Sequence, residues 1–404
     1  MLSKVDRIKL LQMGKELGNA DSMFALGFCY QEGDGVEKDK KRAMELFQKA
    51  SELGHVCAML NLGISFECGD GVLQNTEEAY HLFQQVMNKG ERNALVKIGL
   101  CFFHGKGVRE DKKKAVSLFK QAADLGQTYA MLHLGNWYLR GNGVPHDQKR
   151  GLHLLQQASD LGNSHALVNL AKCFDNGDNV RQDKKKAIEL YQRAAIVENT
   201  NAMVKLGLSY LNGDGVSQDI EKGVEMFEKA STFGSLYAMF NLAICYEKGE
   251  GVEQDQQKAI TLYRQASEKG DTSSMFNLAD CYLNGNGVVQ DEKKAFELYQ
   301  LASNKGCGNA MVNLALLYLH GKTVPHDKKQ ALTWLQRAAE IGNSNAMVNL
   351  GVCYLRGECV RQDKNKAIEL FQCAAEKGDV DAVTKLKVID VACQWVRKDK
   401  KVRE

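Results

Sequence analysis

The chain has 404 residues, of which 44 % are hydrophobic and 25 % are charged, which is enough for a large buried core. Lysine and arginine outnumber aspartate and glutamate by only 53 to 50, a balance that gives no support for a nucleic-acid binder. No apolar run reaches the roughly 18 residues that cross a bilayer, and the N-terminal residues lack a signal-peptide pattern. We therefore expect a cytoplasmic protein without membrane insertion.

A four-residue pattern, Gly-x-Gly-Val, recurs every 36 residues with only local substitutions. Ten periods fill residues 33–392 without insertion or deletion, and no linker or shift in composition separates them. We therefore expect one domain over 1–404. The periods begin at Gly33, Gly69, Gly105, Gly141, Gly177, Gly213, Gly249, Gly285, Gly321 and Gly357.

A longer period is also present. Residues 156–195 and 336–375 lie 180 apart and share several short stretches, and the only two prolines, Pro145 and Pro325, have the same spacing. Duplication of a block of five units explains this pattern and says nothing about function.

The segment after each turn predicts a helix, which we name the B-type helix. Asp39 or its equivalent occupies the N-cap, where its carboxylate can accept a free backbone N–H. Apolar residues follow at helical spacing, and Gly54 or its equivalent ends the helix in the left-handed conformation. Asn75 replaces the aspartate once. Glu198 replaces the glycine once, so we expect a less regular helix end there.

A second, A-type helix is predicted from about Val56 to Glu67, with small residues beside large ones along one stripe. Small residues allow two helix backbones to approach closely. Helices of about 13 residues are marginal alone, so each pair must stack on its neighbours. The sequence therefore predicts an all-α fold, a right-handed α-solenoid superhelix of antiparallel helix pairs with a 36-residue period.

The two ends fit incomplete units. Residues 3–18 resemble a lone B-type helix, with Ser3 at the N-cap, and predict an N-terminal capping half-repeat. Residues 381–404 predict a C-terminal capping A-type helix followed by a basic tail. Terminal units of a solenoid need a polar outer face, which this tail supplies.

The pattern Ala-x-x-x-Leu-Gly-x-x-Tyr-x-x-Gly-x-Gly-Val-x-x-Asp-x-x-Lys-Ala, closing with Ala-Ala-x-x-Gly, resembles the Sel-1-like repeat, a branch of the tetratricopeptide-like helical repeats. Clear copies begin at Ala130 and Ala346. The second glycine of the turn is replaced by Asn179, Thr323 and Cys359, and Asn tolerates the left-handed conformation best of the three. At Thr323 we expect a different turn.

The resemblance implies a protein-binding scaffold, a monomeric solenoid rather than an enzyme. Members of this family act as adaptors in protein degradation, as regulators or assembly factors, and in host interaction. A cysteine-rich branch, for which β-lactam binding is claimed, carries two bridging cysteines per unit. Most units here have one, so that property does not transfer. A solenoid hydrolase and a purely structural spacer remain as alternatives.

Residues that could carry chemistry occupy repeat positions. Six of the twelve cysteines fill one slot, where we expect reduced, small packing residues. No Cys-x-x-Cys or His-Glu-x-x-His pattern occurs, so we expect no metal and no other cofactor. The Gly-x-Gly-Val turn follows a helix, whereas a phosphate-binding loop follows a strand. Lysine runs such as residues 112–114 are interpreted either as a solubilising surface ridge or as a docking surface for an acidic partner.

The best candidate site is one face of the A-type helices. Three slots, those of Asn61, Ile64 and Cys68, are spaced by three and four residues and so share a side. In helical-repeat superhelices these helices line the concave surface. Asparagine amides could bind both groups of an extended peptide backbone, and cations could attract its acidic side chains. We therefore expect a groove for an extended, acidic protein segment, although the same asparagines could instead hold turns or helices together. The predicted groove residues are Asn61, Lys97, His133, Arg140, Asn169, Lys205, Asn241, Lys248, Asn277, Asn313, Asn349 and Arg356.

Overall fold

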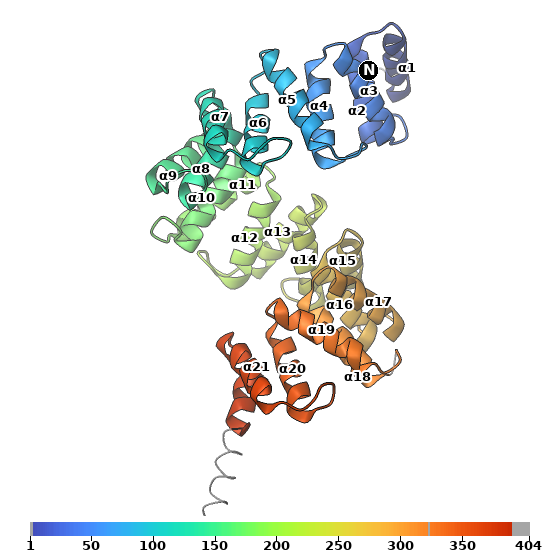
Figure 1. Ribbon diagram of the computed structural model, residues 1–404, viewed down its shortest axis with the longest axis vertical. Coiled ribbons are helices and arrows are strands. Elements are labelled where there is room, and N and C mark those ends of the chain that lie inside the picture. Colours follow the sequence, from blue (N-terminus) through green and yellow to red (C-terminus); the bar gives the residue numbers. More distant parts are fainter. Residues whose placement is uncertain (1–2, 322–323, 390–404) are drawn as a thin grey trace, which may run out of the picture. The chain divides into compact units, whose positions relative to one another are not determined.

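The computed structural model describes residues 3–321 and 324–389, and every regular element in these ranges is a helix. The chain divides into two compact units, residues 1–199 and 200–404 (Figure 1). The prediction of a single domain over 1–404 stays a prediction. The basic tail beyond residue 389 and the turn at Thr323 lie outside the described residues.

The helices follow one another at nearly constant length. Residues 1–199 contain α1 (Lys4–Glu16), α2 (Ala20–Glu32), α3 (Lys40–Glu52), α4 (Val56–Cys68), α5 (Thr76–Asn88), α6 (Ala94–His104), α7 (Lys112–Asp124), α8 (Thr128–Arg140), α9 (Gln148–Asp160), α10 (Ser164–Asn176) and α11 (Lys184–Ile196). The second unit contains α12 (Thr200–Asn212), α13 (Ile220–Thr232), α14 (Leu236–Lys248), α15 (Gln256–Glu268), α16 (Thr272–Asn284), α17 (Glu292–Asn304), α18 (Gly308–His320), α19 (Lys328–Glu340), α20 (Ser344–Arg356), α21 (Lys364–Glu376) and a final helical segment over 380–389.

Even-numbered helices are the A-type helices and odd-numbered helices are the B-type helices. Within each unit, a helix packs mainly against the helices before and after it in the chain. Figure 1 shows this succession of helix pairs within each unit. The predicted all-α solenoid of stacked pairs is confirmed.

The capping residues act as the sequence predicts. The Asp39 carboxylate accepts a hydrogen bond of 2.9 Å from the backbone N–H of Arg42, and Asn75 caps α5 in the same way. Gly54 adopts φ +89° after α3. Glu198 is forced to φ +58°, and the C-cap before it, Val197, departs to φ −96° and ψ 31°. A side chain there costs energy because L-residues rarely adopt positive φ.

The distance between the two helices of a pair depends on the size of the residues that face each other. Gly63 of α4 lies against the ring of Phe83 of α5, and a Cβ atom at Gly63 would come within 2.7 Å of that ring. The same glycine–phenylalanine pairing occurs at Gly207 and Phe227. Where the small residue is alanine, as at Ala279, the opposing residue 20 positions later can be tyrosine, as at Tyr299. These facing positions therefore set how closely the helices of a pair pack.

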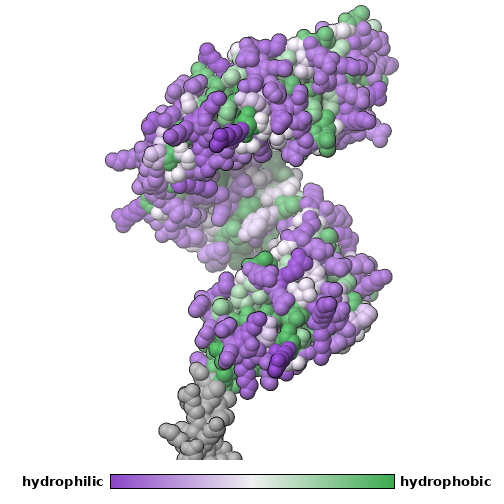
Figure 2. Space-filling view, viewed as in Figure 1, coloured by the Kyte–Doolittle hydropathy of each residue, from purple (hydrophilic) through white to green (hydrophobic). Residues whose placement is uncertain are grey.

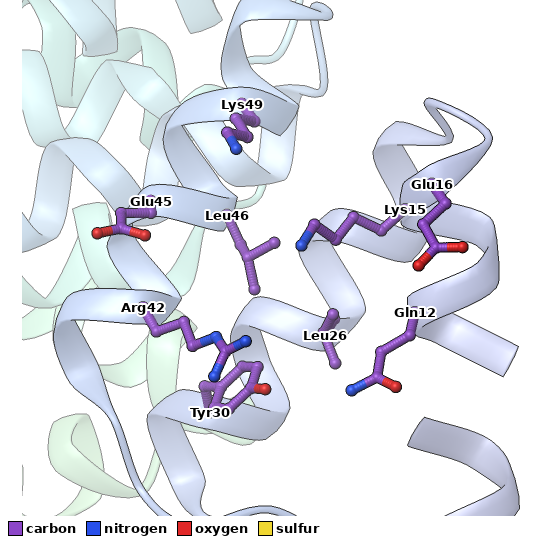
Figure 3. A pocket seen from close by; sticks show the side chains of 9 residues that line it. All are labelled: Gln12, Lys15, Glu16, Leu26, Tyr30, Arg42, Glu45, Leu46 and Lys49. Atoms are coloured by element: carbon purple, nitrogen blue, oxygen red, sulfur yellow. The ribbon is translucent and has the colours of Figure 1, made fainter. Parts of the chain in front are cut away.

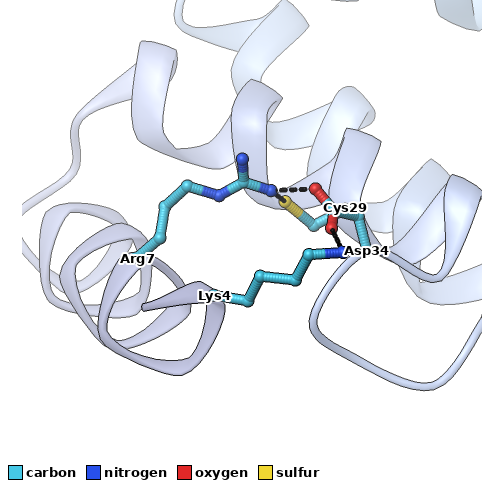
Figure 4. Close-up of polar contacts among 4 residues, drawn as sticks. All are labelled: Lys4, Arg7, Cys29 and Asp34. Carbon is cyan, nitrogen blue, oxygen red and sulfur yellow. Dashed lines mark hydrogen bonds and ion pairs between the residues drawn. The ribbon is translucent and has the colours of Figure 1, made fainter. Parts of the chain in front are cut away.

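The N-terminal half-repeat is tied to the first full pair by polar contacts (Figure 4). Lys4 Nζ lies 3.0 Å from Asp34 Oδ1, and the Arg7 guanidinium also pairs with Asp34. Arg7 further donates to the Cys29 sulfur at 3.5 Å. Lys4, and then Arg7, hold the pKa of the Asp34 carboxyl below its usual range. The predicted helix over 3–18 is therefore present as α1 and anchored at the turn after α2.

A recurrent contact explains one of the basic residues that open the odd-numbered helices. Lys114 Nζ lies 4.2 Å from the Phe102 ring centroid, and Lys186 Nζ lies 4.2 Å from the Phe174 ring centroid. Equivalent cations lie over aromatic rings in most units, a contact worth about 0.5–1 kcal/mol when exposed. The third residue after the capping aspartate thus contributes to packing within the pair and is more than a solubilising charge.

Candidate functional site

The first slot of the predicted groove lies half-buried on the even-numbered helices, and the residue 14 positions earlier affects its contacts. In three units where that residue is phenylalanine or leucine, the asparagine amide bonds its own helix, whereas Asn169, which follows Leu155, bonds Asn136. Asn61, Asn241 and Asn349 donate to the carbonyls of Cys57, Tyr237 and Asn345 at 2.7–2.8 Å. One amide hydrogen and the amide oxygen then remain for another partner.

Where the earlier residue is tyrosine, the asparagine ties two helices together. Asn277 donates to the Tyr263 hydroxyl at 3.0 Å, and Asn313 donates to the Tyr299 hydroxyl at 3.1 Å. Asn313 also donates to Asp280 at 3.2 Å. These two asparagines therefore have a structural role, the alternative that the sequence left open.

The other predicted residues of this slot also contact their surroundings. Lys97 Nζ lies 3.4 Å from a Glu67 carboxylate oxygen. His133 is packed among aromatic rings, the nearest being Tyr129 with centroids 4.4 Å apart. Burial, and then His104, lower the pKa of the His133 imidazole. Lys205 is half-buried on α12.

The third slot supplies cations at the ends of even-numbered helices. Lys248 lies 3.6 Å from Glu250, and Arg356 lies 3.3 Å from Glu358. Arg140 is exposed and, among the described residues, forms no ion pair. The twelve predicted residues divide between the units. Asn61, Lys97, His133, Arg140 and Asn169 lie in residues 1–199, and the other seven lie in residues 200–404.

Acidic side chains interrupt this face in the second unit. Tyr263 donates to Glu247 at 2.8 Å, and Tyr299 donates to Asp280. Burial raises the pKa of the Asp280 carboxyl, although the bonds from Tyr299 and Asn313 oppose that effect. Glu247 lies in a slot outside the three predicted ones, and Glu67 and Asp175 occupy the same slot in the first unit, where Tyr191 donates to Asp175 at 3.5 Å. Both units therefore combine cations with acidic side chains on this face.

A cleft of about 430 Å³ opens on this face in the first unit, between α8 and α10. It combines two predicted residues, Arg140 and Asn169, with residues that the sequence analysis did not select. Its lining residues are Asn136, Leu139, Arg140, Asn169, Lys172, Cys173, Asn176, Asp178 and Asn179. The signal that could have found them is a change of character in the Ile64 slot, which is apolar in most units.

Hydrogen bonds order the carboxamides of this cleft. Asn169 Nδ2 donates to Asn136 Oδ1 at 3.3 Å, and Asn176 Nδ2 donates to Asp178 at 2.9 Å. Burial, and then Asp178, raise the pKa of the Cys173 thiol, while Arg140 lowers it. Because the net shift is upward, the thiol remains protonated at neutral pH and is a poor nucleophile.

A second pocket, of about 310 Å³, lies between α1, α2 and α3. Figure 3 shows side chains of both charge signs around it, including Lys15, Arg42 and Glu45. The Arg42 guanidinium stands 4.8 Å from the Tyr30 ring centroid, the same cation–ring contact seen in other units. This pocket therefore repeats a packing feature of the fold and has no single charge preference.

The surface of each unit is mainly hydrophilic with smaller apolar patches (Figure 2). Within the described residues, no helix combines the length and apolar character needed to cross a bilayer. Among the same residues, no three His, Cys, Asp or Glu side chains gather where they could hold a metal ion.

Repeated helix pairs with a polar even-helix face define an α-solenoid repeat protein. The Sel1 repeat model matches the chain ten times, and the chain belongs to this family. The matched residues are 20–55, 58–85, 92–127, 128–163, 164–196, 200–232, 236–271, 272–307, 308–343 and 344–379. Proteins of this kind are typically non-enzymatic scaffolds that bind other proteins.

Two solved structures illustrate the likeness. A Sel1 repeat protein from Oxalobacter formigenes is 30% identical, with a TM-score of 0.57, covering 61% of this chain and 99% of that one. A protective antigen with this fold from uropathogenic Escherichia coli is 27% identical, with a TM-score of 0.48, covering 95% and 90%. A comparison with curated proteins finds no match.

Proposed function

We propose that the protein is a scaffold that binds an extended, acidic segment of another protein along its even-numbered helices. The observation that carries this proposal is the cleft between α8 and α10. There, two cations and four carboxamides gather on the face that the sequence predicts to bind. Carboxamides can donate to a peptide carbonyl and accept from a peptide N–H, and cations favour carboxylates.

Both units carry cations and acidic side chains on this face. In the first unit Lys97 pairs with Glu67, whereas Arg140 and Lys172 line the cleft. In the second unit, Asn241 and Asn349 keep donor and acceptor capacity for a peptide backbone.

Selection from a random peptide library displayed on phage, with the full chain immobilised, tests the proposal. We expect enriched peptides to be rich in Asp and Glu and to lose binding when salt is raised, because exposed charge pairs are screened. The variant Asn241→Ala/Asn349→Ala should weaken capture without unfolding, since both amides bond only exposed helix carbonyls. Enrichment of peptides without acidic residues would refute the proposal, and no enrichment at all would favour a structural spacer.

A further inference from the structure

Two of the three polar residues in the Ile64 slot line the cleft between α8 and α10, and the third is Asp280 of α16. In seven of the ten units the Ile64 slot is apolar, occupied by Phe28, Ile64, Leu100, Leu208, Ile244, Leu316 and Val352. Two neighbouring units instead carry Asn136 and Lys172, and both side chains line the cleft. The apolar residues of this slot are partly buried in most units, so a polar residue there gives up apolar burial.

A third departure lies at the same cleft. Asn179 replaces the second glycine of the turn and adopts φ +62°, a conformation that costs energy for any residue with a side chain. The turn is held from α9 and the segment before it. Gln148 donates to the Asn179 carbonyl, and the His146 ring nitrogen lies 2.9 Å from the Asn179 amide oxygen. Asn136, Lys172 and Asn179 therefore all line one cleft, and each differs from the residue found at its position in most other units.

Two cations and two amide groups of the cleft are available to bind a ligand. Arg140 and Lys172 are exposed, and neither has an ion pair or a side-chain hydrogen bond among the residues that the structure describes. Asn136 uses its amide oxygen to accept from Asn169, which leaves its amide nitrogen to donate outward. The Asn169 amide oxygen is left to accept. A simple anion would use only the donors, whereas a peptide uses the donors and the acceptor.

We infer that this cleft is the anchoring subsite for one acidic side chain and its adjoining backbone in the bound segment. Arg140 and Lys172 hold the carboxylate, and Asn136 and Asn169 bond the peptide groups beside it. This inference rests on the proposed function and assigns its specificity to four residues. Asp178, held by Asn176 at the rim, disfavours a second carboxylate close to the first.

The internal duplication supplies a matched control. At a spacing of 180 residues, Asn136 corresponds to Leu316 and Lys172 to Val352. Leucine and valine therefore already occupy these two slots in the corresponding units of the second half of the chain. The variant Asn136→Leu/Lys172→Val should fold normally while it loses the polar character of the cleft. A thermal unfolding curve matching that of the parent chain confirms that the variant is folded.

The experiment measures fluorescence anisotropy of a labelled peptide of alternating Glu and Gly against the full chain, with a Gln–Gly twin as a comparison. We expect Asn136→Leu/Lys172→Val and Arg140→Gln each to weaken binding of the Glu peptide about tenfold or more, since each removes charged hydrogen bonds. Lys185→Gln, which removes an exposed cation from α11, should leave binding unchanged. The Gln–Gly peptide should bind weakly to all of these proteins.

Equal binding of the Glu peptide by the parent and Asn136→Leu/Lys172→Val would overturn the inference while leaving an acidic-segment scaffold intact. Absence of acidic peptides from the phage selection would refute the proposed function itself. Displacement of the Glu peptide by excess inorganic phosphate, without any dependence on Asn136 or Asn169, would show a general anion site and also overturn the inference.

Discussion

Two thiols in the second unit come unusually close together. Cys353 is buried on α20, and Cys359 occupies the second glycine position of the following turn, with their sulfur atoms 3.6 Å apart. Burial, and then Cys359, raise the pKa of the Cys353 thiol to about 12. The Cys353 thiol is therefore a poor nucleophile by itself, because only the thiolate is nucleophilic.

We predict that mild oxidation with diamide joins Cys353 to Cys359. The sulfur atoms need to close to about 2.05 Å, a small movement for a turn residue. Diamide takes up the two thiol hydrogens as the bond forms, and peptide mapping by mass spectrometry would find the crosslinked peptide. Cys359→Gly, which restores the residue of most other units, should abolish the crosslink. Two free thiols at these positions after full oxidation of the parent chain would contradict the prediction.

At the scale of one helix, the sequence predicts the elements closely, because each helix carries its own start and stop signals. The A-type helix expected from about Val56 to Glu67 is α4, Val56–Cys68. Side-chain partners were harder to predict. Asn241 and Asn277 share one slot, yet one bonds its own helix and the other bonds Tyr263. The choice depends on a residue of the preceding helix, and helical periodicity alone does not contain that information.

Packing between helices predicts a local stability effect. Leu278 of α16 is 3% exposed and lies in the core with Tyr263 and Ile260. Leu278→Ala should lower the free energy of unfolding by about 2–5 kcal/mol, because it removes buried methyl groups and leaves a cavity. Leu301→Ala on α17, where the side chain is 46% exposed, is the control and should change stability little. Chemical denaturation of both variants measures the difference, and equal midpoints would show that the register is wrong.

Across the whole molecule, contacts are local in sequence, since each helix packs mainly on its chain neighbours within a unit. Stability in such an array is approximately a sum of unit and nearest-neighbour contributions. The fold class could therefore be predicted from the 36-residue period. The division into residues 1–199 and 200–404 could not, because no change of composition or linker marks residue 199.

We predict that residues 1–199 fold without the rest of the chain. This fragment retains α1 to α11 and the contacts among them, so it should show a helical circular-dichroism spectrum and a cooperative thermal transition. The fragment contains the whole α8–α10 cleft, so it should also bind the Glu peptide with the affinity of the full chain. A fragment that is mostly random coil would contradict this prediction.

The matched caps and facing residues described for each helix pair have an evolutionary consequence. Successive pairs repeat the same caps and facing residues at a spacing of 36 residues, so recombination within the gene can delete or insert one whole module and keep the repeat in register. Such an event leaves the residues of the α8–α10 cleft untouched but moves them one module nearer to, or farther from, an end of the protein. Related proteins can thus differ in the distance between this cleft and other binding sites while they keep the same cleft.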